Sequence, residues 1–160
     1  MPTPFDEINV IFYDMIEKDH DFFDYYGLSP VEAMNLAEAR ADSCLTQAAT
    51  KLSIEYETDV NFSDFDTDER TFAAELNAEE KYLLARLQYQ QYLHRDFATL
   101  RAQSTLFTSA EQMVFSPANE RKTFVAMYSM LCDENRNLVN AYLWKDRNSR
   151  TRKALTYEDL

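Results

Sequence analysis

The residues best suited to binding chemistry lie near the C-terminus, where the single tryptophan of the chain begins a cationic segment. Tryptophan and arginine are enriched among the side chains that carry binding energy at protein interfaces. A basic segment of this kind can also order itself on an acidic partner surface. We therefore predict that six residues bind a partner: Trp144, Lys145, Arg147, Arg150, Arg152 and Lys153. The alternative that the pattern leaves open is a frayed, solubilising terminus.

A second charged group is a dense acidic segment in the middle of the chain. Asp64, Asp66 and Asp68 occupy the first, third and fifth positions of the spacing used by calcium loops, and Glu75 occupies the twelfth. The sixth position, where such a loop needs glycine for its sharp turn, is Glu69. We therefore interpret Asp64, Asp66, Asp68 and Glu69 as a solvated acidic loop, and we expect no metal and no cofactor.

Sequence patterns typical of catalysis are incomplete. His94-Arg95-Asp96 is similar to the catalytic tripeptide of protein kinases, but the chain lacks their glycine-rich loop and their Asp-Phe-Gly segment. The two histidines and two cysteines are not clustered as the ligands of a zinc site would be. Cys44 and Cys132 are accordingly interpreted as small apolar core residues. We predict that the protein is not an enzyme.

The composition indicates one acidic, helical domain. The chain has 160 residues, a size at which about 70% of the unfolded surface is buried on folding. It contains a single glycine, whereas turn-rich β-sandwiches and barrels need many more. The net charge is −12, with −14 on residues 1–144, so the body is unsuited to binding nucleic-acid phosphates. Neither a secretory signal nor an apolar run of about 20 residues is visible, and we expect a cytoplasmic protein without a membrane span.

Hydrophobic periodicity predicts one short helix and three long ones. The short helix covers residues 3–18, and the long helices cover residues 29–53, 77–103 and 116–145. Capping sequences open the long helices, and the clearest of them is the capping box Ser29-Pro30-Val31-Glu32. The last helix is expected to be the element around which the others pack.

The same periodicity assigns the residues of the core. Gln88 is predicted to face away from it. The inner faces of the long helices are predicted to include Met34, Ala37, Ala41, Cys44, Leu45, Ala48, Leu52, Leu83, Leu87, Leu93, Phe97, Leu100, Phe124, Met127, Tyr128, Leu131, Leu138, Ala141 and Tyr142.

The predicted fold class is all-α. Residues 1–146 form a single domain, a bundle of about four helices of which two or three are long. The pattern loosens between residues 54 and 76, and the sequence leaves open whether this acidic region is an extended loop or a short hairpin. Residues 147–160 are predicted to form a flexible basic tail.

Three stretches of the chain resemble the head–tail connector (adaptor) proteins of long-tailed bacteriophages. They are SPVEAMNLAEAR at residues 29–40, the helix at residues 89–101 that contains YLHRD, and FSPANERK at residues 115–122. Counted with the last helix, which FSPANERK opens, these stretches span residues 29–146, and none of them is a specific signature. The acidic insertion at residues 59–75 is longer than expected for a minimal connector.

The resemblance implies a structural virion protein located in the neck and assembled in the host cytoplasm. Such proteins form a ring, here of about twelve subunits, beneath the portal protein. The ring extends the DNA channel and gives tail-completion or neck proteins a docking surface. DNA would pass without specific binding, because an acidic lining repels its backbone. In this setting Asp64, Asp66, Asp68 and Glu69 would line the channel or its rim, and the basic tail would contact the portal or a neighbouring subunit.

The charge also permits a function of another class. An acidic regulatory protein can imitate DNA and inhibit a nucleic-acid enzyme of the host, and a net charge of −12 suits such a mimic. The basic tail argues against this alternative, since a mimic gains nothing from positive charge there.

Overall fold

The computed structural model describes residues 1–16, 27–106 and 117–153, and the side chains at 96–106 and 117–122 are excepted. Within these ranges the chain forms four helices and three short strands. The helices are α1 (Phe5–Met15), α3 (Pro30–Glu55), α4 (Ala78–Leu106) and α5 (Pro117–Leu143). The strands are β1 (Thr3–Pro4), β2 (Phe65–Asp66) and β3 (Thr71–Phe72).

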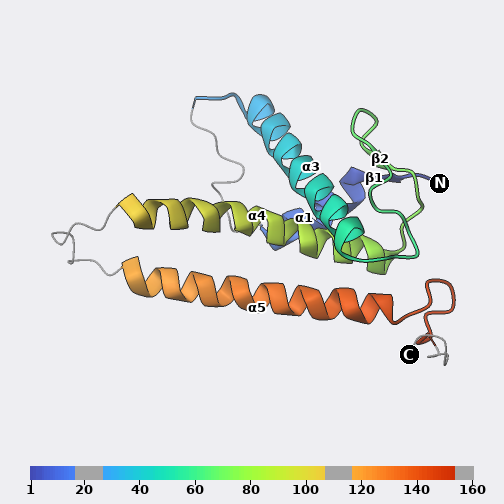
Figure 1. Ribbon diagram of the computed structural model, residues 1–160. Helices are drawn as coiled ribbons and strands as arrows, with labels where there is room; N and C mark the ends of the chain where they lie inside the picture. Colours follow the sequence, from blue (N-terminus) through green and yellow to red (C-terminus); the bar gives the residue numbers. More distant parts are fainter. Residues whose placement is uncertain (17–26, 107–116, 154–160) are drawn as a thin grey trace.

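Helix α4 is the centre of the fold. It packs against α1, α3 and α5, and Figure 1 shows it lying between α3 on one side and α5 on the other. The sequence analysis placed the last helix at the centre, and the structure corrects this. Helix α4 has apolar side chains directed to several neighbours, and its residues Leu83, Leu84 and Ala85 are all buried.

Two long helices begin at the predicted capping boxes. In α3 the Ser29 hydroxyl accepts a hydrogen bond from the Glu32 N–H, and the Glu32 carboxylate accepts one from the Ser29 N–H. In α4 the Glu80 N–H donates to the Asn77 side chain at 2.9 Å, and the Asn77 N–H donates to the Glu80 carboxylate at 2.8 Å. These bonds satisfy backbone donors that have no partner inside the helix. The predicted cap at Ser116 lies outside the described residues.

Among the described side chains, the core follows the predicted helix faces with four exceptions. Ala37, Ala41, Ala48 and Leu45 of α3 are buried, which lets α4 approach closely. Met34, Met127 and Ala141 were predicted inside, but all three are exposed. Gln88 was predicted to face outward and is instead fully buried.

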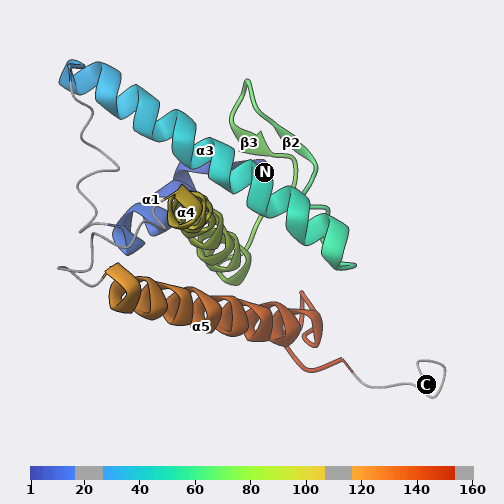
Figure 2. The same ribbon diagram turned by 60° about the vertical axis from the view of Figure 1, so that its left-hand side comes forward.

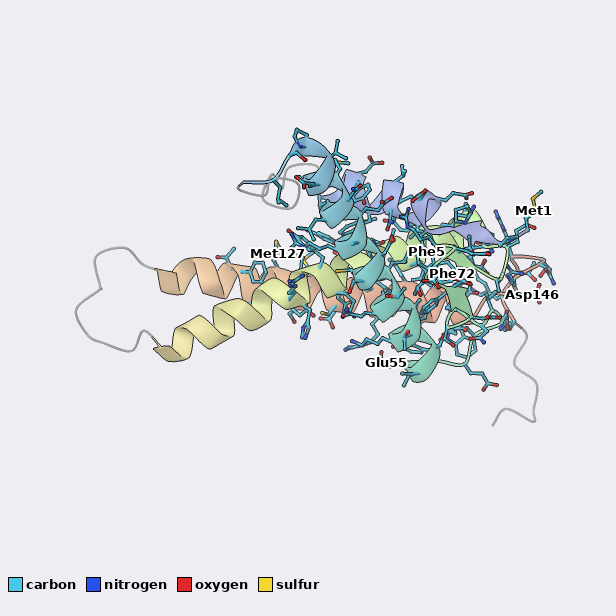
Figure 3. The ribbon with its side chains drawn as sticks, turned by 90° about the horizontal axis from the view of Figure 1, so that it is seen from above. Met1, Phe5, Glu55, Phe72, Met127 and Asp146 are labelled. Carbon is cyan, nitrogen blue, oxygen red and sulfur yellow. The ribbon has the colours of Figure 1, made fainter. Side chains whose placement is uncertain are left out.

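A small three-stranded sheet accompanies the helices, whereas the all-α prediction left open only a short hairpin. Its order is β1-β3-β2, and both pairs are antiparallel, so the region around residues 64–72 is a hairpin rather than an extended loop. Phe72 on the central strand packs against Phe5 and Phe65, with ring centroids 5.1 and 5.9 Å away. Figure 3 shows Phe5 and Phe72 side by side at the start of α1. The fold is therefore mostly helical, with a three-stranded sheet pinned to the helices by aromatic side chains.

The chain beyond α5 also differs from the prediction. Residues 144–153, which we call the C-terminal hairpin, turn back on themselves and form a β-bridge between Lys145 and Arg152. A flexible tail was predicted to begin at residue 147, but contacts with the body order the chain as far as Lys153. Residues 154–160 lie outside the described residues.

None of the helices in the described part of the chain is both long enough and apolar enough to cross a bilayer.

Candidate functional site

The C-terminal hairpin brings together most of the residues predicted to bind a partner. A cavity of about 660 Å³ lies against it, lined by Ala141, Trp144, Lys145, Arg150, Arg152 and Lys153. Five of the six predicted residues therefore share one site, and the sixth, Arg147, points into the body of the protein instead. The cavity is cationic on an otherwise acidic protein, which suits an acidic ligand.

Backbone hydrogen bonds hold this hairpin in shape. The Lys153 N–H donates to the Trp144 carbonyl at 2.8 Å, and the Asp146 N–H donates to the Thr151 carbonyl at 2.8 Å. Arg150 completes the turn with a φ of 55°, in the left-handed region that residues other than glycine seldom adopt. The backbone hydrogen bonds of the neighbouring residues therefore hold Arg150 in this conformation and give the turn a defined structure.

The carboxylate of Asp146 closes the turn from inside. It accepts hydrogen bonds from the N–H groups of Asn148 at 3.0 Å and Ser149 at 2.7 Å. These bonds favour the charged form, so they hold the pKa of Asp146 below its usual value. Asp146 lies at the end of the molecule away from Met127 (Figure 3).

A buried ion pair fastens the C-terminal hairpin to the start of α4. Arg147 donates to the Glu80 carboxylate from Nε at 2.7 Å and from Nη2 at 3.1 Å. Tyr142 donates to the same carboxylate at 3.0 Å, and the Glu80 side chain is 0% exposed. Glu80 thus caps α4 and binds the C-terminal hairpin at the same time.

The pKa values of this group follow from its surroundings. Burial raises the pKa of Glu80, but the hydrogen bonds from Arg147, the Asn77 N–H and Tyr142 outweigh burial and leave the pKa below its usual value. The pKa of Tyr142 is raised by burial and by the adjacent Glu80 charge. At neutral pH the carboxylate is therefore charged and the tyrosine is a proton donor to it.

Two further cations of the C-terminal hairpin bind carboxylates of the body. Lys145 pairs with Glu79, next to the buried ion pair, and Lys153 pairs with Asp59 at 3.0 Å. Both lysines were predicted to bind a partner, and within the chain each of them pairs with a carboxylate. The other residues of the C-terminal hairpin that line the cavity are not paired in this way. Trp144 is 53% exposed, and Arg150 and Arg152 make no ion pair within the described residues.

The predicted acidic loop forms the tip of the β2–β3 hairpin, and we call residues 64–69 the acidic turn. One oxygen of the Asp66 carboxylate accepts hydrogen bonds from the N–H groups of Asp68 at 2.8 Å and Glu69 at 2.9 Å. The side chains of Asp64, Asp68 and Glu69 are exposed and make no hydrogen bond or ion pair within the described residues. The turn therefore presents free carboxylates on a fixed backbone.

Arg70 anchors this turn to the helices. Its φ is 54°, and its guanidinium binds Asp42 at 2.6 Å, Asp6 at 2.8 Å and Glu38 at 2.6 Å. The hydrogen bond to Asp42 is the main cause that raises the pKa of Arg70. A left-handed residue other than glycine costs about 1 kcal/mol, and three carboxylates from α1 and α3 offset that strain.

Behind Arg70 lies a polar network that the sequence analysis missed. Asp42 accepts from the Asn9 amide at 2.7 Å, and Gln88 donates to Asn9 at 2.8 Å and to the Ala41 carbonyl at 3.0 Å. The signal that could have found it is the spacing of Glu80, Leu84 and Gln88. Residues four apart share a helix face, and all three are 0% exposed.

Glu75 and His94, which were considered for metal binding and catalysis, have other partners within the chain. The described residues contain no group of three His, Cys, Asp or Glu side chains that could hold a metal ion. Glu75, the twelfth position of the calcium spacing, pairs with the terminal ammonium of Met1 at 2.7 Å. His94 contacts the Tyr128 hydroxyl through Nδ1 at 3.1 Å, and the side chain of Asp96 lies outside the described residues.

Comparison of the chain with protein-family models, curated proteins and solved structures finds no match.

Proposed function

We propose that the protein is a structural virion protein, a head–tail connector whose C-terminal hairpin docks on partner subunits. It would form a ring beneath the portal, extend the DNA channel and give tail-completion proteins a docking surface. The observation that carries the docking role is the C-terminal hairpin itself, where Trp144, Arg150 and Arg152 stand exposed around one cavity. The connector assignment rests in addition on the resemblance at residues 29–40, 89–101 and 115–122.

A docking element benefits from being ordered before it binds. Fixing a mobile tail on a partner loses conformational entropy, and an ordered hairpin avoids much of that loss. The buried pair of Arg147 and Glu80 supplies the order, while Trp144 offers a large apolar surface and the arginines offer forks for carboxylates. This division of labour supports a docking role for the exposed residues.

The acidic turn suits the proposed passage of DNA. Asp64, Asp68 and Glu69 are exposed, and Asp66 stands between them with one oxygen facing the turn. A ring that carries such turns toward its lumen or rim would repel phosphates and let the genome move without adhering.

The exposed acidic turn also favours the second candidate, an acidic inhibitor that imitates DNA. Against it stands the use of many carboxylates inside the protein, where Arg70 alone binds three of them. Such an inhibitor would compete with DNA for a basic protein, and added salt would weaken the competition strongly.

The test of the connector function is disruption of the gene in the phage that encodes it. We expect lysates with DNA-filled heads and separate tails in negative-stain images, and wild-type protein supplied in trans should restore joined particles. Protein with Trp144, Arg150 and Arg152 all replaced by alanine should fail to restore them, while an Arg136→Ala control, changed on an exposed face of α5, should succeed. Normal joining of tails in the disrupted phage would exclude the proposal.

A further inference from the structure

We infer that the cationic cavity of the C-terminal hairpin binds the acidic turn of a second copy of this chain. The inference rests on the proposed function and deepens it, because it names the partner of the exposed residues Trp144, Arg150 and Arg152. The joined segments would be residues 144–153 of one subunit and residues 64–69 of the next.

The C-terminal hairpin already binds carboxylates within its own chain. Arg147, Lys145 and Lys153 each hold one, on Glu80, Glu79 and Asp59 respectively. Arg150 and Arg152 have the same chemistry, line the same 660 Å³ cavity and make no ion pair within the described residues. An arginine guanidinium binds a carboxylate through two parallel hydrogen bonds, so the unused arginines specify an acidic ligand.

The acidic turn has the complementary surface. Asp64, Asp68 and Glu69 are the exposed carboxylates of a hairpin that Arg70 fixes to three acidic side chains of α1 and α3. Only the backbone N–H groups of Asp68 and Glu69 take part in the turn, which leaves their side chains free for a ligand role. Two ordered surfaces of opposite charge pair with little loss of conformational entropy.

The two surfaces of one subunit lie apart, so the pairing joins different copies. Figures 1 and 2 show the β2–β3 hairpin on the α3 side of α4, while the chain beyond α5 turns on the other side. Within the described residues, the side chains of the C-terminal hairpin bind Glu75, Glu79, Glu80 and Asp59 of the body, none of which belongs to the acidic turn. An interface between unlike surfaces continues from copy to copy and closes into a ring when the rotation allows it.

The test uses two variants with reversed charge. One variant carries Asp68→Lys and Glu69→Lys, and the other carries Arg150→Glu and Arg152→Glu. The backbone hydrogen bonds of both turns are retained in each. Native mass spectrometry over a range of concentrations should show multimers for the wild type. Each variant alone should associate about a hundredfold more weakly or not at all, because like charges then face each other.

Mixing the two variants supplies the decisive result. At one interface the lysines of the first variant face the glutamates of the second, and at the next interface the unchanged arginines of the first face the unchanged carboxylates of the second. The mixture should therefore regain multimers in which the two masses alternate. A control with Lys51→Glu and Arg136→Glu changes the net charge by the same amount as the arginine reversals, on exposed residues elsewhere, and should associate like the wild type.

Three results would overturn the inference: a wild type that stays monomeric, variants that still associate alone, or a mixture that stays monomeric. None of these touches the proposed function, which stands or falls on tail joining in the disrupted phage. Normal tail joining there would remove the connector function even if the charge-reversed pair assembled as expected.

Discussion

Within the described residues, Glu80 is the only fully buried carboxylate that joins the C-terminal hairpin to the start of α4. Replacing Glu80 by glutamine removes the charge of this carboxylate. Glu80 accepts hydrogen bonds from Arg147 at 2.7 and 3.1 Å, from Tyr142 at 3.0 Å and from the Asn77 N–H at 2.8 Å. A glutamine amide has only one acceptor oxygen, so it can accept only some of these hydrogen bonds. Its NH₂ group then faces side chains that are themselves hydrogen-bond donors.

The expected loss of stability follows from burial. Breaking a buried ion pair by removing one partner typically costs 3–5 kcal/mol. Arg147 keeps partial contact with solvent, at 31% side-chain exposure, and keeps its hydrogen bond to the Glu75 carbonyl. We therefore expect about 2–3 kcal/mol for Glu80→Gln, near the lower end of that range. For a domain of this size the melting temperature should fall by about 5–10 °C.

The neighbouring residue provides a matched control. Glu79→Gln makes the same chemical change one position earlier, in a pair with Lys145 whose side chains are 38% and 40% exposed. Exposed ion pairs contribute about 0–1 kcal/mol, so this variant should melt close to the wild type. The difference between Glu80→Gln and Glu79→Gln isolates the effect of burial.

Thermal unfolding followed by circular dichroism measures the two stabilities, and hydrogen exchange locates the change. The amide protons of Asp146 and Lys153 close the C-terminal hairpin, and they should exchange faster in Glu80→Gln than in Glu79→Gln. A double-mutant cycle with Arg147→Met should give a coupling energy above about 1.5 kcal/mol for Glu80. Equal melting temperatures for the two glutamine variants, or coupling near zero, would refute the reasoning.

Two further predictions concern the pH dependence of the Glu80 contacts and the buried hydrogen bond between Gln88 and Asn9. Because the pKa of folded Glu80 lies below its usual value, its stabilising effect is present above the unfolded pKa of about 4.3 and is lost as pH falls through the folded pKa. Denaturant titrations should show the free energies of unfolding of wild type and Glu80→Gln converging as the pH falls from about 5 to about 3. A difference in free energy that stays constant with pH would exclude the Glu80 charge as its cause. Gln88→Leu removes the donor to the side-chain oxygen of buried Asn9. The free energy of unfolding, measured by thermal unfolding, should fall by about 2–3 kcal/mol. Half-buried Gln91→Leu should change little, and equal losses in the two variants would contradict a role for the buried network.

The sequence was most informative where the deciding bonds are local. The start of α3 follows from Ser29 and Glu32, and that of α4 from Asn77 and Glu80, since each capping box closes over only three residues. Helix periodicity likewise predicted three of the buried alanines of α3, which are Ala37, Ala41 and Ala48. The cationic residues of the candidate site were also visible, because their types and clustering need no knowledge of the fold.

What the sequence could not supply is the choice among distant partners. Thr3 pairs with Phe72, and Arg147 selects Glu80 from the 28 acidic residues of the chain. Gln88 was misplaced for the same reason, because its polar partner Asn9 comes from another helix.

The sequence alone determined where α3 and α4 begin, through local capping bonds, and most of the apolar helix faces, through hydrophobic periodicity. Only tertiary packing decided that α4 is central, that the acidic region is a hairpin and that the basic segment is ordered. Each of those results depends on which surfaces of the chain are buried against one another. A buried charge or amide must then pair with whichever polar group the packing of the helices brings next to it.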